Sequence, residues 1–394
     1  MKITAIRATP VNIPLEAPYL WSYGSLAGFS KTIVEVETDA GITGLGEGPS
    51  HLNAATISAA FAPRLSGCDP IDIAAAERLC LPSWRGVSTS IDFSAIRSFG
   101  AIEMALWDIR GKAWGQPLHK LLGGAVRADI PFTDYFGFRA AAGKIGGETT
   151  PEAVVDYCLR QREEHGTTFF EGKVSTADPE PSIQMLRQLR GALGDRAMLR
   201  IDSNMAYSLT QARHIARAIE PLNIRNWEDP VATPEECVQL RQHTAIPFSM
   251  HNIDLRRFAA LGVPDAVCTD VNVHGGIGRT MKFIGACEQM GIDFWLYSGD
   301  SGIASAAYLH IAAACQWLRE PSQSLFRMQP LDVIEEGPFQ PKNNVVKVPN
   351  GPGLGVTLSS KALAYCHKLF ADHGPYNKYH DPDRPGLYRR LPLS

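Results

Sequence analysis

Residues 169–173 read FFEGK and residues 198–202 read MLRID, and four more runs of the same kind follow before residue 298. Each is a short apolar or β-branched run ending in a polar residue; the later ones are 224–228 (IRNWE), 247–252 (PFSMHN), 266–270 (AVCTD) and 294–297 (FWLY). The end residues are separated by 29, 26, 24, 18 and 27 positions. One strand, one helix and two loops take roughly 25–30 residues, so this spacing is typical of βα units.

Helix-like segments, such as 181–193 and 209–219, separate these runs. So many consecutive βα units predict an α/β fold, closed as a modified (β/α)8 barrel of the TIM type. In such a barrel the carboxyl ends of all strands meet at one mouth, where the chemistry takes place. The runs would therefore bring a lysine, two carboxylates and an amide to that mouth.

The length and composition leave room for a second domain. A chain of 394 residues exceeds a barrel of about 250 residues. A hydrophobic content of 45% is ordinary for a globular core. We expect an α+β capping domain over residues 1–128, the barrel over 129–325, and a C-terminal segment over 326–394 that returns to the capping domain.

Charge and cysteine usage exclude several classes of protein. A formal charge of −3 provides no basic field, so nucleic acid is not expected as a partner. There is no run of about 18 apolar residues, so no membrane association is expected, and no signal peptide is visible. The eight cysteines are scattered without CxxC pairs and predict buried free thiols in a cytoplasmic protein.

The first 128 residues suggest strands followed by helices. Residues 3–16 suggest a strand, and 31–38 with 42–48 a hairpin around Asp39-Ala40-Gly41. We expect residues 17–30, rich in glycine, serine and aromatics, to form a loop that could cover a ligand. Helices are expected at 53–66, 70–80 and 100–122, the last broken at Gly115-Gln116-Pro117, and the first barrel strand at 130–135.

The oxygen-bearing residues Asp202, Glu228 and Asn252 end three successive runs. Three such donors with waters suit a hard octahedral cation such as Mg²⁺. The alternative is that acidic strand ends cap neighbouring helices. For three residues in the same register we favour the metal site.

Lys173 ends the first run and could remove a proton next to a substrate carboxylate, since a nearby cation and burial would lower its pKa. The alternative is a structural ion pair. Glu171 lies two residues away on the same strand face, and a carboxylate there would keep Lys173 charged.

The last runs place further polar groups at the mouth. Tyr297 could donate a proton to a leaving hydroxyl, or only pack and bond to backbone. Asp270 ends the preceding run, and His251 could act as an acid or as a hydrogen-bonding partner of the site. The glycines at 275, 276 and 278 lack the Walker lysine and the Rossmann spacing, so we interpret them as a loop.

Several segments together resemble the enolase superfamily, in its mandelate racemase branch, and most closely its glucarate dehydratase subgroup. They are 101–112 (AIEMALWDIRGK), 121–124 (LLGG), 201–204 (IDSN), 227–230 (WEDP) and 348–355 (VPNGPGLG), and the resemblance extends from residue 1 to about 375. The subgroup assignment depends mainly on Asn252, because most relatives carry glutamate as the third metal ligand.

The resemblance implies Mg²⁺ at Asp202, Glu228 and Asn252. We expect Lys173, Tyr297 and Asp270 to be catalytic residues, and Asn204 and His251 to bind the substrate. It also implies a small-molecule carboxylate, such as an acid sugar, as substrate, and a homo-oligomeric assembly. Two positions depart from the family. Glu171 stands where relatives have the first lysine of a Lys-x-Lys pair, and Tyr297 stands where they have histidine.

We therefore expect a Mg²⁺-dependent lyase that abstracts the proton α to a carboxylate and eliminates a β-hydroxyl. Two alternatives remain at this point. One is an isomerase, epimerase or cycloisomerase on the same scaffold. The other is a carboxylate-binding protein without turnover, because the lysine and the histidine are absent. Specificity is expected to lie in residues 17–30 and 82–95.

Overall fold

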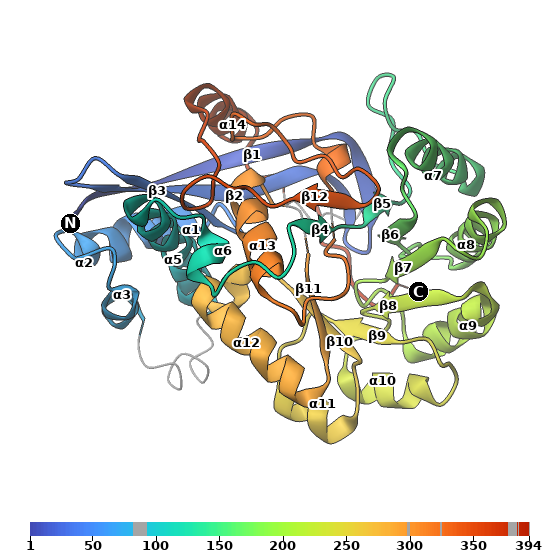
Figure 1. The fold of residues 1–394 in the computed structure, drawn as a ribbon. Helices are drawn as coiled ribbons and strands as arrows, with labels where there is room; N and C mark the ends of the chain where they lie inside the picture. The colour runs from blue at the N-terminus through green and yellow to red at the C-terminus, as the bar shows by residue number, and fades with distance from the viewer. Residues whose placement is uncertain (82–92, 298–299, 324, 377–383, 385, 394) are drawn as a thin grey trace.

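Three antiparallel strands open the chain and form the sheet of the capping domain. They are β1 (Ile3–Trp21), β2 (Gly24–Thr38) and β3 (Thr43–Gly48). The computed structural model describes residues 1–81, 93–297, 300–323, 325–376, 384 and 386–393. Figure 1 shows this sheet as a long blue ribbon across one side of the barrel. The predicted hairpin over 31–48 is confirmed, with Thr32 opposite Gly48.

Helices follow the sheet as expected. They are α1 (Asn53–Thr56), η1 (Ile57–Phe61), α2 (Ala62–Leu65), α3 (Ile73–Cys80), α5 (Phe93–Trp114) and α6 (Leu118–Leu121). The break between α5 and α6 falls at the predicted Gly115-Gln116-Pro117. Helix α5 lies so close to β3 that a Cβ on Gly46 would be 1.9 Å from the backbone oxygen of Ala101. Glycine is therefore required where the helix crosses the sheet.

Seven parallel strands form the barrel sheet, in the order β11-β10-β9-β8-β7-β6-β5. Their bounds are β5 (Asp134–Phe136), β6 (Phe169–Lys173), β7 (Met198–Asp202), β8 (Ile224–Glu228), β9 (Phe248–Met250), β10 (Ala266–Thr269) and β11 (Asp293–Leu296). The predicted runs are therefore strands, and the (β/α) barrel with a capping domain is confirmed.

The eighth position of the barrel is taken by residues 321–323 instead of a full strand. The Thr133 N–H donates to Ser322 O at 2.9 Å on one side, and the Gln323 N–H donates to Leu296 O at 2.9 Å on the other. These bonds join β5 to β11 and close the ring. The barrel therefore differs from a regular (β/α)8 barrel at its eighth strand position.

The predicted strand over 130–135 is in fact two strands with different partners. β4 (Asp129–Pro131) pairs antiparallel with β12 (Val345–Lys347), and only β5 joins the barrel. Pro131 has no N–H to continue a ladder, and the chain changes partner after it.

Helices cover the outside of the barrel (Figure 1). They are α7 (Pro151–His165), α8 (Glu180–Leu193), α9 (Leu209–Ile219), α10 (Pro234–Arg241), α11 (Leu255–Leu261), α12 (Ile277–Met290) and α13 (Gly302–Ala314), with short 3₁₀ turns η2 (Glu220–Leu222), η3 (Val271–His274) and η4 (Phe326–Met328). Local sequence explains several of their ends. Ser208 with Gln211, and Thr233 with Glu236, form capping boxes at α9 and α10.

Residues 17–30 are not the loop predicted from their composition. β1 continues to Trp21 and β2 begins at Gly24, so the segment is the tip of a long hairpin. The hairpin is held extended by the barrel, because the Leu20 N–H donates to Phe138 O and the Ala140 N–H to Pro18 O, both at 2.8 Å. This backbone pairing with the segment after β5 is invisible in the local sequence.

Two buried carboxylates of the capping domain dock it onto the barrel by binding helix N-termini. Glu103 in α5 accepts from the N–H groups of Ile277 and Gly278, at 2.7 and 2.9 Å, at the start of α12. Glu47 in β3 accepts from the N–H groups of Ser301 and Ala304, both at 3.0 Å, at the start of α13. A carboxylate at a helix N-terminus satisfies otherwise unpaired donors. The glycine-containing loop at 275–278 therefore binds the side chain of Glu103.

The C-terminal residues return to the capping domain. Helix α14 (Ser360–His373) lies against β1, where Asn12 Nδ2 donates to Gly374 O at 2.8 Å and His367 Nδ1 lies 2.7 Å from Pro10 O. None of the helices in the described part of the chain is long and apolar enough to cross a bilayer. All eight cysteines are free and seven are buried, as predicted.

A buried histidine pair lies where α6 meets α13. The Nδ1 atoms of His119 and His310 are 3.0 Å apart, and His310 Nε2 lies 3.1 Å from Leu354 O. Burial lowers the pKa of His310 to about 4, from an ordinary value of 6.5. The native structure therefore holds His310 uncharged at neutral pH.

We expect His310 to lower the free energy of unfolding at pH 5.0 relative to pH 7.5, when compared with a variant that lacks this histidine. The unfolded chain binds a proton at this histidine near pH 6.5, whereas the folded chain does so only near pH 4, so acid favours the unfolded state. His310 alone should account for about 2 kcal/mol of the loss at pH 5. Urea unfolding at the two pH values measures it. His310→Gln should lose less, His243→Gln at an exposed position should behave as wild type, and an unchanged loss in His310→Gln would contradict the assignment.

Candidate active site

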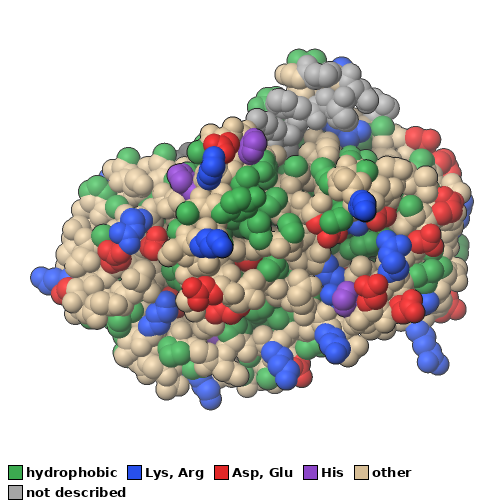
Figure 2. Space-filling model, turned by 90° about the horizontal axis from the view of Figure 1, so that it is seen from above, with side chains coloured by type: hydrophobic (Ala, Val, Ile, Leu, Met, Phe, Trp, Pro, Cys, Tyr) green, Lys and Arg blue, Asp and Glu red, His purple; other side chains and the backbone are tan. Residues whose placement is uncertain are grey.

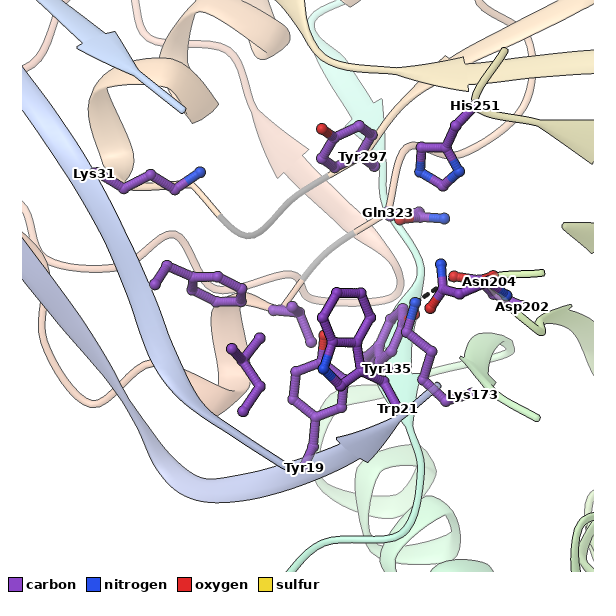
Figure 3. Close-up of a pocket in the computed structure, with 13 residues that line it drawn as sticks. Tyr19, Trp21, Lys31, Tyr135, Lys173, Asp202, Asn204, His251, Tyr297 and Gln323 are labelled. Atoms are coloured by element: carbon purple, nitrogen blue, oxygen red, sulfur yellow. Dashed lines mark hydrogen bonds and ion pairs between the residues drawn. The ribbon is translucent and has the colours of Figure 1, made fainter. Parts of the chain in front are cut away.

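A cavity of about 220 Å³ lies between the barrel mouth and the tip of the β1–β2 hairpin (Figure 3). The hairpin contributes one wall, made of Tyr19, Trp21, Leu26, Phe29 and Lys31. The barrel contributes the other side, made of Tyr135, Lys173, Asp202, Asn204, His251, Tyr297, Gln323 and Leu325. Residues 17–30 therefore cover the mouth, as expected of them, although as a hairpin. Residues 82–92 of the other expected specificity segment lie outside the described residues.

Two buried carboxylates stand side by side at the strand ends. Asp202 ends β7 and Glu228 ends β8, and the two residues are register partners in the parallel sheet. Both are fully buried. Oxygens of Asp202, Glu228 and Asp229 all lie within 4.8 Å of one another. Strand register therefore brings Asp202 and Glu228 together, as the sequence predicted.

These carboxylates fit a divalent cation. Glu228 Oε1 is buried and accepts no hydrogen bond from any described residue; its charge is met by His251 Nε2 at 3.4 Å, too long for a hydrogen bond, so a further binding partner is favourable there. Asp202 Oδ1 is oriented by the Asn204 N–H at 2.7 Å. Paired carboxylate oxygens with one free position suit Mg²⁺ or a similar hard ion.

Asn252, the predicted third ligand, is not brought to this pair. It is exposed, and its Oδ1 accepts from the Asp254 N–H at 2.9 Å, as in an Asx turn before α11. His251 lies in its place, with Nε2 3.4 Å from Glu228 Oε1 and Nδ1 2.7 Å from Asp229 Oδ2. β9 already ends at Met250, so the residue directed at Glu228 comes one position earlier than the sequence suggested.

His251 is positively charged in this arrangement. Burial lowers its pKa, but the charges of Asp229 and Glu228 outweigh that effect and raise the pKa to about 10. An imidazolium is a hydrogen-bond donor and not a metal ligand. His251 also lines the cavity and presents this positive charge to it.

Lys173 is paired with Asp202 and points into the cavity (Figure 3). Burial lowers its pKa, but Asp202, together with Tyr135, Tyr19 and Glu228, raises the pKa well above its usual value. Its ammonium also lies 5.8 Å from the Trp21 ring centroid and 5.7 Å from that of Tyr135. Lys173 is therefore charged as long as Asp202 faces it.

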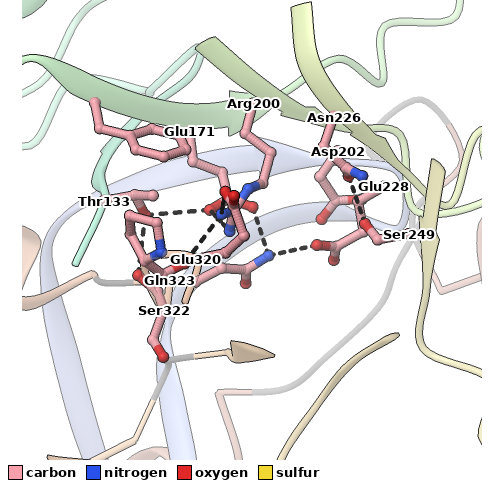
Figure 4. A network of polar contacts seen from close by, with 12 residues as sticks. Thr133, Glu171, Arg200, Asp202, Asn226, Glu228, Ser249, Glu320, Ser322 and Gln323 are labelled. Carbon is pink, nitrogen blue, oxygen red and sulfur yellow. Dashed lines mark hydrogen bonds and ion pairs between the residues drawn. The ribbon is translucent and has the colours of Figure 1, made fainter. Parts of the chain in front are cut away.

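Glu171 is not the partner of Lys173 that the strand pattern suggested. Its carboxylate lies deeper in the barrel, where it accepts from Arg200 Nη1 at 3.1 Å and from Gln323 Nε2 at 2.6 Å (Figure 4). Glu171, which stands where the family resemblance predicted a lysine, is therefore part of a separate buried network.

Tyr297 faces the cavity, and Asp270 holds it from behind. The Tyr297 hydroxyl donates to Asp270 Oδ2 at 2.6 Å, while Asp270 Oδ1 accepts from the Asn272 N–H at 2.6 Å. Burial, and then the charge of Asp270, raise the pKa of Tyr297 well above its usual value, so the hydroxyl keeps its proton. Asp270 does not line the cavity and acts on it only through Tyr297.

Lys31 is a cavity residue that the sequence analysis missed. It projects from β2, is buried, and donates to Asp300, whose other oxygen accepts from Tyr308 at 2.6 Å. Burial lowers the pKa of Lys31, but Asp300 and Glu47 raise it above its usual value overall. The sequence could have indicated it: Lys31 alternates with Phe29 and Ile33 along the strand, so it lies on an apolar face where a lysine is unexpected.

Comparisons with known proteins agree with this geometry. Residues 3–123 match the N-terminal domain of mandelate racemase / muconate lactonizing enzymes, and residues 153–362 match the enolase C-terminal domain-like family. A cis-3-hydroxy-L-proline dehydratase of Roseibium aggregatum is 30% identical over 91% of this chain and 96% of the relative. A probable glucarate dehydratase of Streptomyces coelicolor is 28% identical over 94% of this chain and 92% of the relative, which is too distant to decide the subgroup.

Solved structures show the same fold. An isomerase from Streptomyces coelicolor has a TM-score of 0.80 at 30% identity, covering 93% of this chain and 99% of that one. An enolase from Pseudomonas fluorescens with bound magnesium, potassium and tartrate has a TM-score of 0.86 at 25% identity, covering 95% and 94%. Relatives of this chain thus include both dehydratases and isomerases.

Gly172 is needed for the close approach of β5 to β6, and its replacement should be destabilising. A Cβ there would lie 2.4 Å from both the backbone oxygen and a ring carbon of Phe136. We expect Gly172→Ala to lower the free energy of unfolding by about 1–3 kcal/mol. Thermal unfolding measures this. Gly191→Ala in α8, where a Cβ meets nothing within 4 Å, is the matched control and should be neutral or stabilising. Equal stability of the two variants would contradict the packing argument.

Proposed function

Because the chain belongs to the mandelate racemase / muconate lactonizing enzyme family of the enolase superfamily, we propose that it is a magnesium-dependent carbon–oxygen lyase. Its substrate is a small carboxylic acid with a proton and a hydroxyl on the α-carbon and a second hydroxyl on the β-carbon. Acid sugars, as in the glucarate dehydratases, are the class that the motifs favour. The observation that carries this proposal is the position of Lys173, which lines the cavity and is paired with Asp202, the neighbour of Glu228 in the sheet.

Asp202 and Glu228 are the residues proposed to hold the metal. When bound there, a divalent cation supplies the positive charge that stabilises the second negative charge of an enediolate. Glu228 offers the buried Oε1 for this purpose, which accepts no hydrogen bond from the described residues and lies 3.4 Å from His251 Nε2. The predicted third ligand, Asn252, has no support from its exposed position, and waters or the substrate carboxylate can complete the shell.

Lys173 is proposed as the base. Its ammonium must lose a proton before it can accept one, and the charge of Asp202 prevents this in the pair as it stands. Engagement of Asp202 by a cation would weaken that pairing and lower the pKa of Lys173 toward the range of a general base. The Lys173 amine then removes the α-proton.

Tyr297 is proposed as the acid for the departing group. As the electron pair of the enediolate expels the β-hydroxyl, the C–O bond breaks and the oxygen takes a proton to leave as water. The Tyr297 hydroxyl is protonated, and its proton would pass to the leaving oxygen once the hydroxyl turns from Asp270 toward it. The phenolate would then be reprotonated from solvent. Lys31 is a second charged donor on the hairpin side of the cavity. The enol product tautomerises to a 2-keto-3-deoxy acid.

Asn204 and His251 are proposed to orient the substrate. Asn204 Oδ1 is buried in the cavity wall, and no described residue donates to it, so it can accept from a substrate hydroxyl. His251 lines the same cavity and presents a charged imidazole to it. These two groups distinguish substrate hydroxyls by donor and acceptor character.

Incubation with Mg²⁺ and a panel of aldonic, aldaric and other α,β-dihydroxy acids should yield a 2-keto acid from at least one member. Lys173→Met should lower that rate by roughly 10²–10⁴-fold, because it removes the base, and chelation of the metal should abolish it. Keto-acid formation followed by semicarbazone absorbance is the measurement. Lys282→Met, at an exposed position on α12, is the control and should behave as wild type. Product formation that survives in Lys173→Met would contradict the assignment.

An isomerase is the second candidate, and Lys31 is the observation that favours it. Lys31 places a second amine in the same cavity, across from Lys173, which could return a proton to the other face of the α-carbon. In D₂O, deuterium should then enter the substrate without keto-acid formation. Keto acid without prior exchange of the recovered substrate would instead favour the lyase.

A further inference from the structure

A buried polar network fills the barrel beneath the cavity and reaches the carboxylate pair (Figure 4). Its members Glu171, Arg200, Gln323 and Glu228 are all buried. Arg200 is fully enclosed and donates to Glu171 at 3.1 Å and to Pro321 O at 3.0 Å. None of these contacts belongs to the proposed chemical steps, so the network needs another explanation.

Gln323 is the link between the network and the site. Its Nε2 donates to Glu171 Oε1 and to Glu228 Oε2, each at 2.6 Å, so both amide hydrogens are used. The orientation of the amide follows from its neighbours, since its carbonyl oxygen would be repelled by two carboxylates. Gln323 also lies in the segment that closes the barrel, where its N–H donates to Leu296 O. Its position is therefore set by the backbone.

We propose that Gln323 is a positioning residue that holds Glu228 by Oε2, so that Oε1, which has no hydrogen-bond donor among the described residues and lies 3.4 Å from His251 Nε2, remains available to the metal. This inference rests on the proposed metal site. Of the two oxygens of Glu228, Oε2 has the Gln323 donor, and Oε1 accepts no hydrogen bond in the described part of the chain. Gln323 presents a neutral donor between two carboxylates that would otherwise repel each other. A lysine there would instead lower the negative charge available to a cation.

The anchoring of Gln323 explains the role of Glu171 at a position where the motif departs from that of the relatives. Thr133 Oγ1 donates to Glu171 Oε2 at 3.1 Å, on the same oxygen that accepts from Arg200. Glu171 is thereby immobilised and in turn fixes one hydrogen of Gln323. Because the amide group is planar, the second hydrogen of Gln323 Nε2 then points toward Glu228. Groups that orient a metal ligand in this way typically contribute 10–100-fold to metal affinity.

Titration of the full-length protein with MgCl₂ in a calorimeter tests this without any substrate. Gln323→Met keeps the volume but removes both donors, and we expect Mg²⁺ to bind at least tenfold more weakly. Gln329→Met is the matched control, since Gln329 is an equally buried glutamine that donates to Asp300 O and does not touch Glu228. It should bind Mg²⁺ within threefold of wild type even if its unfolding temperature falls as much as that of Gln323→Met.

Gln323→Asn provides a second test if Gln323→Met does not fold. The shorter amide cannot reach both carboxylates, and its Mg²⁺ affinity should also fall by at least fivefold. Wild-type affinity in the folded Gln323 variants, or an equal loss in Gln329→Met, would overturn the positioning role alone. Failure of the wild-type protein to bind Mg²⁺ would overturn the proposed metal site and this inference together.

Discussion

The register of three adjacent parallel strands is the constraint on which the site depends. Lys173 is opposite Asp202, and Asp202 is opposite Glu228, so backbone hydrogen bonds fix the spacing of one cation and two carboxylates. A shift of one residue in either pairing would turn these side chains to the other face of the sheet. The chemistry of the mouth is therefore a consequence of barrel geometry and not of loop conformation.

The second constraint is the docking of the capping domain. Glu47 and Glu103 each bind the N-terminus of a barrel helix, which fixes β3 and α5 relative to the barrel. Because β2 is paired with β3, and β1 with β2, the hairpin tip is carried over the mouth and pairs there with residues 138–140. Docking of the capping domain therefore places Lys31 and the aromatic side chains of the hairpin in the cavity wall.

The buried charges of the site are balanced in pairs. Lys173 faces Asp202, Lys31 faces Asp300, and Arg200 faces Glu171. His251 lies between Asp229 and Glu228. Removal of one partner from such a pair leaves an uncompensated buried charge, which costs far more than the pair contributes. This balance makes the site sensitive to a cation that competes for Asp202, and it links binding to the charge state of Lys173.

The sequence by itself determined the barrel, the capping hairpin over 31–48, and the strand-end positions of Lys173, Asp202 and Glu228. These follow from strand period and helix spacing, which are local properties of the chain. The tertiary structure alone decided that residues 17–30 are strand, that His251 and not Asn252 faces Glu228, and that Glu171 pairs with Arg200. Each of these depends on contacts between segments far apart in the chain, where pairing partners and burial override local composition. Lys31 and Gln323 entered the site for the same reason, since only closure of the barrel and docking of the cap bring them to it.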